Sequence, residues 1–264
     1  MNRPVLTVPK VNKRQKLALL SLVLSALLAG GLRYGAPWWA DAVWLVSVYG
    51  TVVLVLGADL KREEWLVMPL PALLWGAAGL SWLRLLHLED PVRIVLGSAL
   101  VGLGFYAIIL GTNILNVATV RTVPLARTAL TVLHAFGLLS GFLLLYRALA
   151  GQPAPVLWLA AVFGTTFLTA WPLLWNSLEE GGRLGRSLVW SGVVGLLMVE
   201  IGSLAALWPA SFMTGLFLTT VAFCSIGLLH YQERHLLTSQ IKRQYVLLGA
   251  IMGVVYYFVT QWGS

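Results

Sequence analysis

One carboxyl group lies deep in an apolar part of the chain. Glu200 sits in the run VVGLLMVEIGS, residues 193 to 203, with no other charged side chain nearby in the sequence. An ionised carboxylate at the centre of a membrane costs about 3 kcal/mol or more. We therefore expect Glu200 to face the inside of a helix bundle with hydrogen-bond partners, or to be protonated. Two interpretations stay open: a proton or cation relay, or a carboxyl group that links helices structurally.

Depth along the helix predicts the partners of Glu200. At 1.5 Å per residue, Glu200 lies about 18 Å from the cytoplasmic end of its segment. Tyr256 and Tyr257 reach the same height, and the pairs Thr165–Thr166 and Thr219–Thr220 reach it approximately. Hydroxyl groups are thus the expected partners, which favours a neutral carboxyl group over an ion pair.

A histidine completes this predicted protonatable site. His134 lies at about 9 Å on the same scale, on the helical face that also carries Gly137 and Gly141. Two interpretations of His134 stay open. Either its imidazole titrates as part of a proton path, or it is a neutral imidazole that is hydrogen-bonded at a contact between helices. We interpret the GxxxG spacings of Gly137 with Gly141, and of Gly249 with Gly253, as packing within the chain. The predicted site comprises Glu200, His134, Tyr256 and Tyr257.

A second group of polar residues lies in two connections on the predicted cytoplasmic side. The stretch NILNVATVRTVPLAR, residues 113 to 127, provides two amides and two arginines, and the connection after Trp175 provides carboxylates and another arginine. Such arginines could bind an anionic lipid headgroup or a small anion, or serve a lipid-modifying enzyme. An ordinary solvated, salt-bridged surface is the alternative. The predicted cluster is Asn113, Asn116, Arg121, Arg127, Glu179, Glu180 and Arg183.

Motifs for metal, nucleotide or nucleophilic chemistry are missing from the sequence. There is no P-loop, HExxH, GxSxG or paired-aspartate motif, and Cys224 is the single cysteine. His230 and His235 stand five residues apart, with Glu233 between them, which is a poor metal-ligand pattern. We therefore expect no cofactor and no metal, and we favour a protein that is not an enzyme.

Composition places these residues in a membrane. Of 264 residues, 59% are hydrophobic and 11% charged, at a mean hydropathy of +0.84, whereas a soluble domain is about a quarter charged. The sequence predicts an all-α, polytopic transmembrane bundle of nine spans in a single domain, 17–264, after a basic tail, 1–16. The predicted spans are 17–32, 42–58, 65–83, 94–115, 128–146, 154–175, 188–207, 212–229 and 245–262.

The distribution of basic residues predicts how the bundle is oriented. With the N-terminus in the cytoplasm, 14 of the 18 lysines and arginines fall in cytoplasmic segments. This asymmetry is typical of the positive-inside rule and would be lost if one span were removed. We predict an N-terminus inside and a C-terminus outside. The formal net charge of +8 therefore indicates how the protein is oriented in the membrane. We expect the lipid bilayer as its partner and expect no nucleic acid.

Several segments resemble a known family. NVATVRTVPLARTA, WNSLEE, VEIGSLAALWP and GLFLTT, within residues 100 to 250, resemble in order an uncharacterised polytopic membrane-protein family of candidate-phylum bacteria. Where that family suggests Arg-Glu-Tyr before the last span, this chain has Arg243-Gln244-Tyr245. The resemblance implies a bacterial inner-membrane protein and no catalytic residues.

Three functions remain open at this level. The first is a non-enzymatic inner-membrane protein of undetermined activity, whose protein partners the sequence does not indicate. The second is a small proton-coupled secondary transporter that uses Glu200. The third is a lipid-modifying enzyme acting at the cytoplasmic face.

Overall fold

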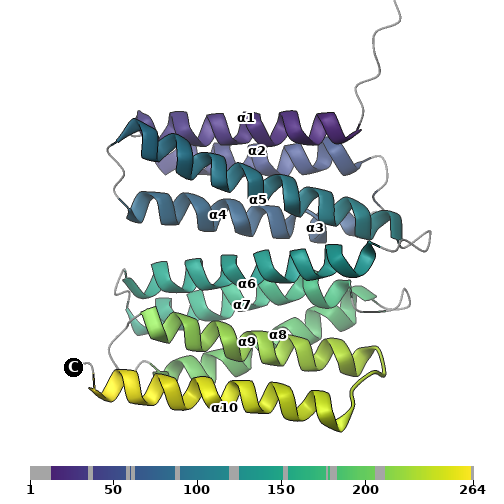
Figure 1. Cartoon of the computed structure of the whole chain (residues 1–264), viewed down its shortest axis with the longest axis vertical. Helices are drawn as coiled ribbons and strands as arrows, with labels where there is room; N and C mark the ends of the chain where they lie inside the picture. Colours follow the sequence, from purple (N-terminus) through teal and green to yellow (C-terminus); the bar gives the residue numbers. More distant parts are fainter. Residues whose placement is uncertain are drawn as a thin grey trace, which may run out of the picture.

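The protein is a bundle of α-helices, and the described residues contain no strand (Figure 1). The computed structural model describes residues 13–34, 38–57, 60, 63–86, 90–118, 125–150, 154–176, 178, 183–205 and 212–262. The helices are α1 (Lys13–Arg33), α2 (Trp38–Leu56), α3 (Glu64–Val67), α4 (Leu70–Leu85), α5 (Pro91–Ala118), α6 (Ala126–Ala150), α7 (Pro155–Trp175), α8 (Arg183–Ala205), α9 (Phe212–Glu233) and α10 (Ser239–Trp262). The predicted all-α class is confirmed.

Nine segments among the described residues are long and apolar enough to cross a membrane, which confirms the predicted number of spans. The short helix α3 and α4 together form one of them, Glu64–Leu85, and each other helix forms one. The helices extend further than the apolar runs: α8 begins at Arg183 and α10 at Ser239, about one and a half turns before the predicted starts. Polar first turns lie at the membrane boundary, where hydropathy no longer marks the helix.

The helices form two halves that meet at α6. Helices α1 to α5 lie together in the upper part of Figure 1, and α6 to α10 in the lower part, with α6 packed against α4 and α5. Within the second half α7 packs on α8, and α10 packs against α9. Successive spans run in opposite directions. We call the end of the bundle where α1 begins the N-terminal end, and the end where α10 finishes the C-terminal end.

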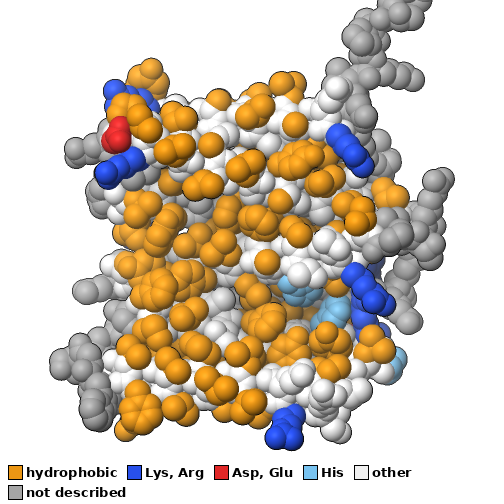
Figure 2. Space-filling model, in the orientation of Figure 1, with side chains coloured by type: hydrophobic (Ala, Val, Ile, Leu, Met, Phe, Trp, Pro, Cys, Tyr) orange, Lys and Arg blue, Asp and Glu red, His pale blue; other side chains and the backbone are white. Residues whose placement is uncertain are grey.

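Side chains on the outside of the bundle are as apolar as those inside it. Leu22, Val46 and Leu54 are 68%, 69% and 79% exposed, and hydrophobic side chains cover the middle of the face in Figure 2. Lys and Arg side chains gather at the two ends in the same view. An apolar exterior with charged ends is what a lipid bilayer requires. The chain is a multi-pass membrane protein.

Candidate functional site: a polar path between α6, α7 and α9

Glu200 lies on the outside of the bundle. Its side chain is exposed, as is that of Leu204, 61% exposed, one turn further along α8. The hydroxyl of Tyr256 instead bonds the carbonyl oxygen of Ala205 at 3.3 Å and the hydroxyl of Thr214 at 3.2 Å. Tyr257 is 54% exposed. The prediction that Glu200 faces the bundle interior is therefore wrong, and the four residues of the predicted protonatable site do not come together.

The small residues of α8 show why the prediction failed. Ser187 and Ser191 are fully buried, and Gly195 packs so closely on α7 that a Cβ there would lie 2.9 Å from the ring of Phe163. Small residues mark the packed side of a membrane helix better than hydrophobicity does. Glu200 follows Ser191 by nine residues, about 900° of helical rotation, so it points to the opposite side. This spacing was available in the sequence.

Two half-buried histidines from different helices meet in the second half of the bundle. The rings of His134 on α6 and His230 on α9 lie edge to face, with their centroids 5.7 Å apart. Nδ1 of His134 lies 2.9 Å from the carbonyl oxygen of Leu130. A carbonyl oxygen only accepts, so Nδ1 carries a proton, and Nε2 is the acceptor whenever the ring is neutral. Figure 2 shows pale-blue histidine side chains reaching the surface between α6 and α9.

Charged groups surround the N-terminal end of this histidine pair. Glu233, at the end of α9, forms an ion pair with Arg186 and accepts a 2.8 Å hydrogen bond from Nε1 of Trp190. The Glu233 side chain is only 7% exposed, whereas that of Arg186 is 54% exposed. Arg234 donates to the carbonyl oxygen of Asn176 at 3.2 Å. A buried carboxylate held by two donors thus lies one turn from His230.

A small cavity with threonine hydroxyls lies deeper along the same helices. It has a volume of about 10 Å³, close to the room one water needs. Leu138 and Ile226 begin its lining, one turn beyond His134 and His230. The hydroxyls of Thr166 and Thr169, on α7, are buried and have no hydrogen-bond partner among the described residues. The lining residues are Leu138, Gly141, Leu145, Thr165, Thr166, Thr169, Thr219, Ala222 and Ile226.

Glycines of α6 bring α7 close to this cavity. A Cβ on Gly137 would lie 3.7 Å from the methyl of Thr169, and one on Gly141 would lie 3.4 Å from the Thr169 hydroxyl oxygen. The Gly137–Gly141 pair therefore packs within the chain, as predicted. At position 249 a Cβ would meet no atom within 4 Å, and at position 253 only the Phe217 ring at 3.9 Å. The second GxxxG pair is thus loosely packed.

Aromatic rings fill the bundle on the C-terminal side of the cavity. Phe142 and Tyr146 of α6 lie 5.1 and 5.9 Å, between centroids, from the ring of Phe212 at the start of α9. Gly215 lets Phe142 approach, since a Cβ there would lie 3.5 Å from that ring. Polar groups thus lead into the second half from the N-terminal end, and an aromatic cluster closes it toward the other end.

The chain matches no protein-family model, no curated protein and no solved structure. The resemblance of residues 100 to 250 to a bacterial membrane family stays a prediction. The function is therefore argued from the geometry.

The predicted anion or lipid cluster is only partly described. Arg121, Glu179 and Glu180 lie outside the described residues, as do residues 1–12 of the predicted tail. Nε of Arg183 donates to the carbonyl oxygen of Trp175 at 2.6 Å, and its guanidinium lies over that ring, 5.1 Å from the centroid. Asn116 is buried, the buried amide oxygen of Asn113 has no partner among the described residues, and Arg127 is exposed. Arg183 is thus held by the end of α7.

The sequence contained the parts of the polar path but not their arrangement. In the sequence, His230 and Glu233 formed only a poor metal-ligand pattern, and nothing distinguished Trp190 from the other tryptophans. Their meeting with His134 depends on how α6, α8 and α9 are rotated. Hydropathy does not report that rotation when every side of a helix is apolar.

Proposed function

We propose that the chain is a non-enzymatic, multi-pass protein of the bacterial inner membrane that acts as a small proton-coupled transporter. The path runs between α6, α7 and α9, not past Glu200. The observation that supports this proposal is the edge-to-face pair of His134 and His230. It lies between a buried, ion-paired carboxylate at the N-terminal end and the threonine cavity further in.

The chemistry of these groups suits proton movement. Histidine is the side chain whose ordinary titration lies nearest to neutral pH. A proton from the N-terminal end would reach the imidazoles past Glu233, and a water in the cavity would carry it on. The hydroxyls of Thr166 and Thr169 would hold that water, since each both donates and accepts hydrogen bonds. In this conformation the cavity has room for about one water, which can carry a proton, but it is too small for a larger solute.

The aromatic cluster gives the path its direction. Phe142, Tyr146 and Phe212 would separate the cavity from the C-terminal end, so a second conformation must part these rings. By the positive-inside rule the polar entrance faces the cytoplasm and the aromatic closure faces outward. Coupling requires that the two sides never open together.

Proton flux in liposomes tests this function. We expect His134→Gln and His230→Gln each to lower flux, driven by a pH gradient and read with an internal pH dye, by about tenfold or more. His235→Asn is the matched control, because His235 lies exposed at the same end with a φ of 54°, which asparagine tolerates. Glu200→Gln should retain flux. Unchanged flux in both histidine variants, or loss in Glu200→Gln alone, contradicts the proposal.

A further inference from the structure

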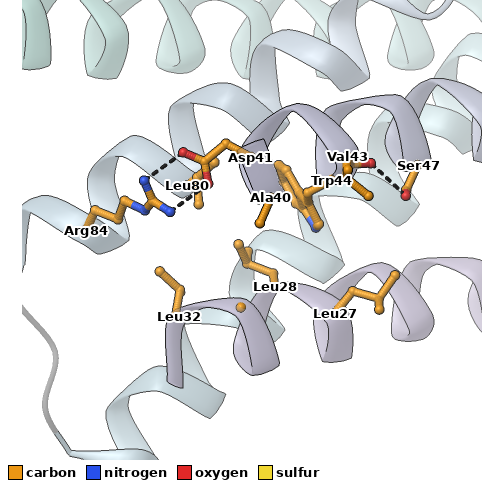
Figure 3. Close-up of a pocket in the computed structure, with 11 residues that line it drawn as sticks. Leu27, Leu28, Leu32, Ala40, Asp41, Val43, Trp44, Ser47, Leu80 and Arg84 are labelled. Atoms are coloured by element: carbon orange, nitrogen blue, oxygen red, sulfur yellow. Dashed lines mark hydrogen bonds and ion pairs between the residues drawn. The ribbon is translucent and has the colours of Figure 1, made fainter. Parts of the chain in front are cut away.

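A crevice opens at the C-terminal end of the first half of the bundle, between α1, α2 and α4. Its volume is about 140 Å³. Leu28 and Leu32 of α1 form an apolar wall across from the side chains of Asp41 and Arg84, and Leu80 of α4 lies beside that charged pair (Figure 3). The crevice is thus apolar on one side and charged on the facing side.

An ion pair forms the charged side of the crevice. The two terminal nitrogens of Arg84 each donate to one oxygen of Asp41 at 2.6 Å, a bidentate arrangement. The Arg84 side chain is 39% exposed and that of Asp41 28% exposed. Asp41 is the third residue of its span and Arg84 the second last of its own. Both charges therefore lie at the level of lipid headgroups.

The crevice opens sideways, toward the surrounding lipid. Leu27 of α1 and Val43 of α2 belong to its lining and are 52% and 56% exposed, so they form a rim on the outer surface of the bundle. Trp44 closes the crevice on the inside: it is 7% exposed, and its ring nitrogen donates to the carbonyl oxygen of Leu24 at 3.5 Å. A molecule can enter from the bilayer without passing through the bundle.

We infer that this crevice binds a zwitterionic phospholipid with an amine headgroup, such as phosphatidylethanolamine. Its phosphate lies against the guanidinium of Arg84, its ammonium against the carboxylate of Asp41, and the first part of an acyl chain between Leu28, Leu32 and Leu80. Opposite charges side by side in the crevice match opposite charges side by side in the headgroup.

The charge balance of the crevice favours this lipid over an anionic one. Asp41 and Arg84 sum to zero, so an anionic headgroup that approaches Arg84 also approaches a carboxylate. A zwitterionic headgroup instead meets a favourable partner at each charge, and such charge-assisted contacts are the stronger hydrogen bonds in proteins. The site therefore differs from the arginine-rich surfaces that attract anionic lipids through net charge.

Native mass spectrometry of the delipidated full-length protein tests the site. The protein is titrated with dioleoyl phosphatidylethanolamine or with dioleoyl phosphatidylglycerol. We expect the first lipid to bind about tenfold more tightly, the factor that one charge-assisted hydrogen bond supplies. Asp41→Asn should remove that preference. Asp90→Asn is the matched control, because Asp90 pairs with Arg93 at 3.7 Å at the same end of the bundle without lining the crevice.

A second variant tests the crevice without changing the ion pair. Ala40 lines the crevice and Ala42, two residues further on, is exposed and does not. Ala40→Leu should fill the space and lower binding of phosphatidylethanolamine about tenfold, whereas Ala42→Leu should leave it unchanged. Equal binding of the two lipids by the natural protein, or equal binding by Ala40→Leu and Ala42→Leu, overturns the inference.

Discussion

At the scale of single residues, the most informative groups are the two buried threonine hydroxyls without partners. A hydroxyl in a membrane helix usually bonds the carbonyl oxygen one turn earlier, as Thr219 does to Gly215 at 2.8 Å and Thr112 to Ile108 at 2.9 Å. Thr166 and Thr169 make no such bond among the described residues. A buried hydroxyl without a partner costs about 1–3 kcal/mol. Their cavity therefore offers bonds to a water or a small ion.

Replacing Thr169 by valine separates function from stability. Thr169→Val keeps the shape and removes a hydroxyl that bonds no protein group, so we expect the free energy of unfolding to stay the same or rise by up to about 1 kcal/mol. Proton flux should fall about tenfold, because the cavity loses a donor and acceptor. Thr112→Val is the control: it loses a hydrogen bond to the carbonyl oxygen of Ile108, so it should lose about 0.5–1.5 kcal/mol of stability and keep its flux. A fall in both quantities for Thr169→Val would mean that the hydroxyl is structural.

At the scale of elements, the sequence predicted the positions of the spans well, but it predicted poorly which side of each helix faces the bundle interior. Length and hydropathy report one coordinate, the depth along the membrane normal, and every predicted span is present. Contacts between side chains of different helices, such as His134 with His230, depend on a second coordinate, the rotation of each helix about its own axis. Lipid is as apolar as a bundle core, so hydrophobicity does not determine that rotation. Small residues do report it, as Ser187 and Ser191 show in α8.

Gly104 allows a very close approach between α4 and α5. A Cβ on Gly104 of α5 would lie 2.4 Å from the ring of Trp75 of α4. That ring is held by two contacts, because its nitrogen donates to the carbonyl oxygen of Val101 at 2.9 Å and the ring packs perpendicular to that of Phe136, with centroids 4.9 Å apart. Gly104 is thus a position where the helices approach more closely than any side chain allows.

Gly104→Ala should therefore destabilise the bundle. We expect a loss of about 1–3 kcal/mol, the usual cost of overpacking, seen as a lower midpoint of thermal unfolding in detergent. Gly192→Ala in α8 is the matched control, since a Cβ there would meet no atom within 4 Å. That variant should be neutral or up to about 1 kcal/mol more stable, as expected for glycine to alanine within a helix. Equal midpoints for the two variants would show that Trp75 moves aside without cost.

At the scale of the whole molecule, the two candidate sites lie at opposite ends of the bundle and therefore on opposite sides of the membrane. The entrance beside Glu233 lies at the N-terminal end, and the crevice beside Asp41 and Arg84 lies at the C-terminal end. With the predicted orientation the first faces the cytoplasm and the second binds a lipid of the outer leaflet. The two sites also belong to different halves, since the first uses α6 to α9 and the second α1, α2 and α4.

The orientation itself is tested by fusing alkaline phosphatase, which is active only outside the cytoplasm, to two positions. We expect activity when the enzyme follows Ser264 and none when it follows Thr238, between α9 and α10. The reason is the charge distribution: predicted cytoplasmic segments have 14 basic and six acidic residues, and the outer segments four and three. The reverse pattern of activity would place the polar entrance outside. The proposed transporter would then take its proton from the outside, and the lipid crevice would lie in the inner leaflet.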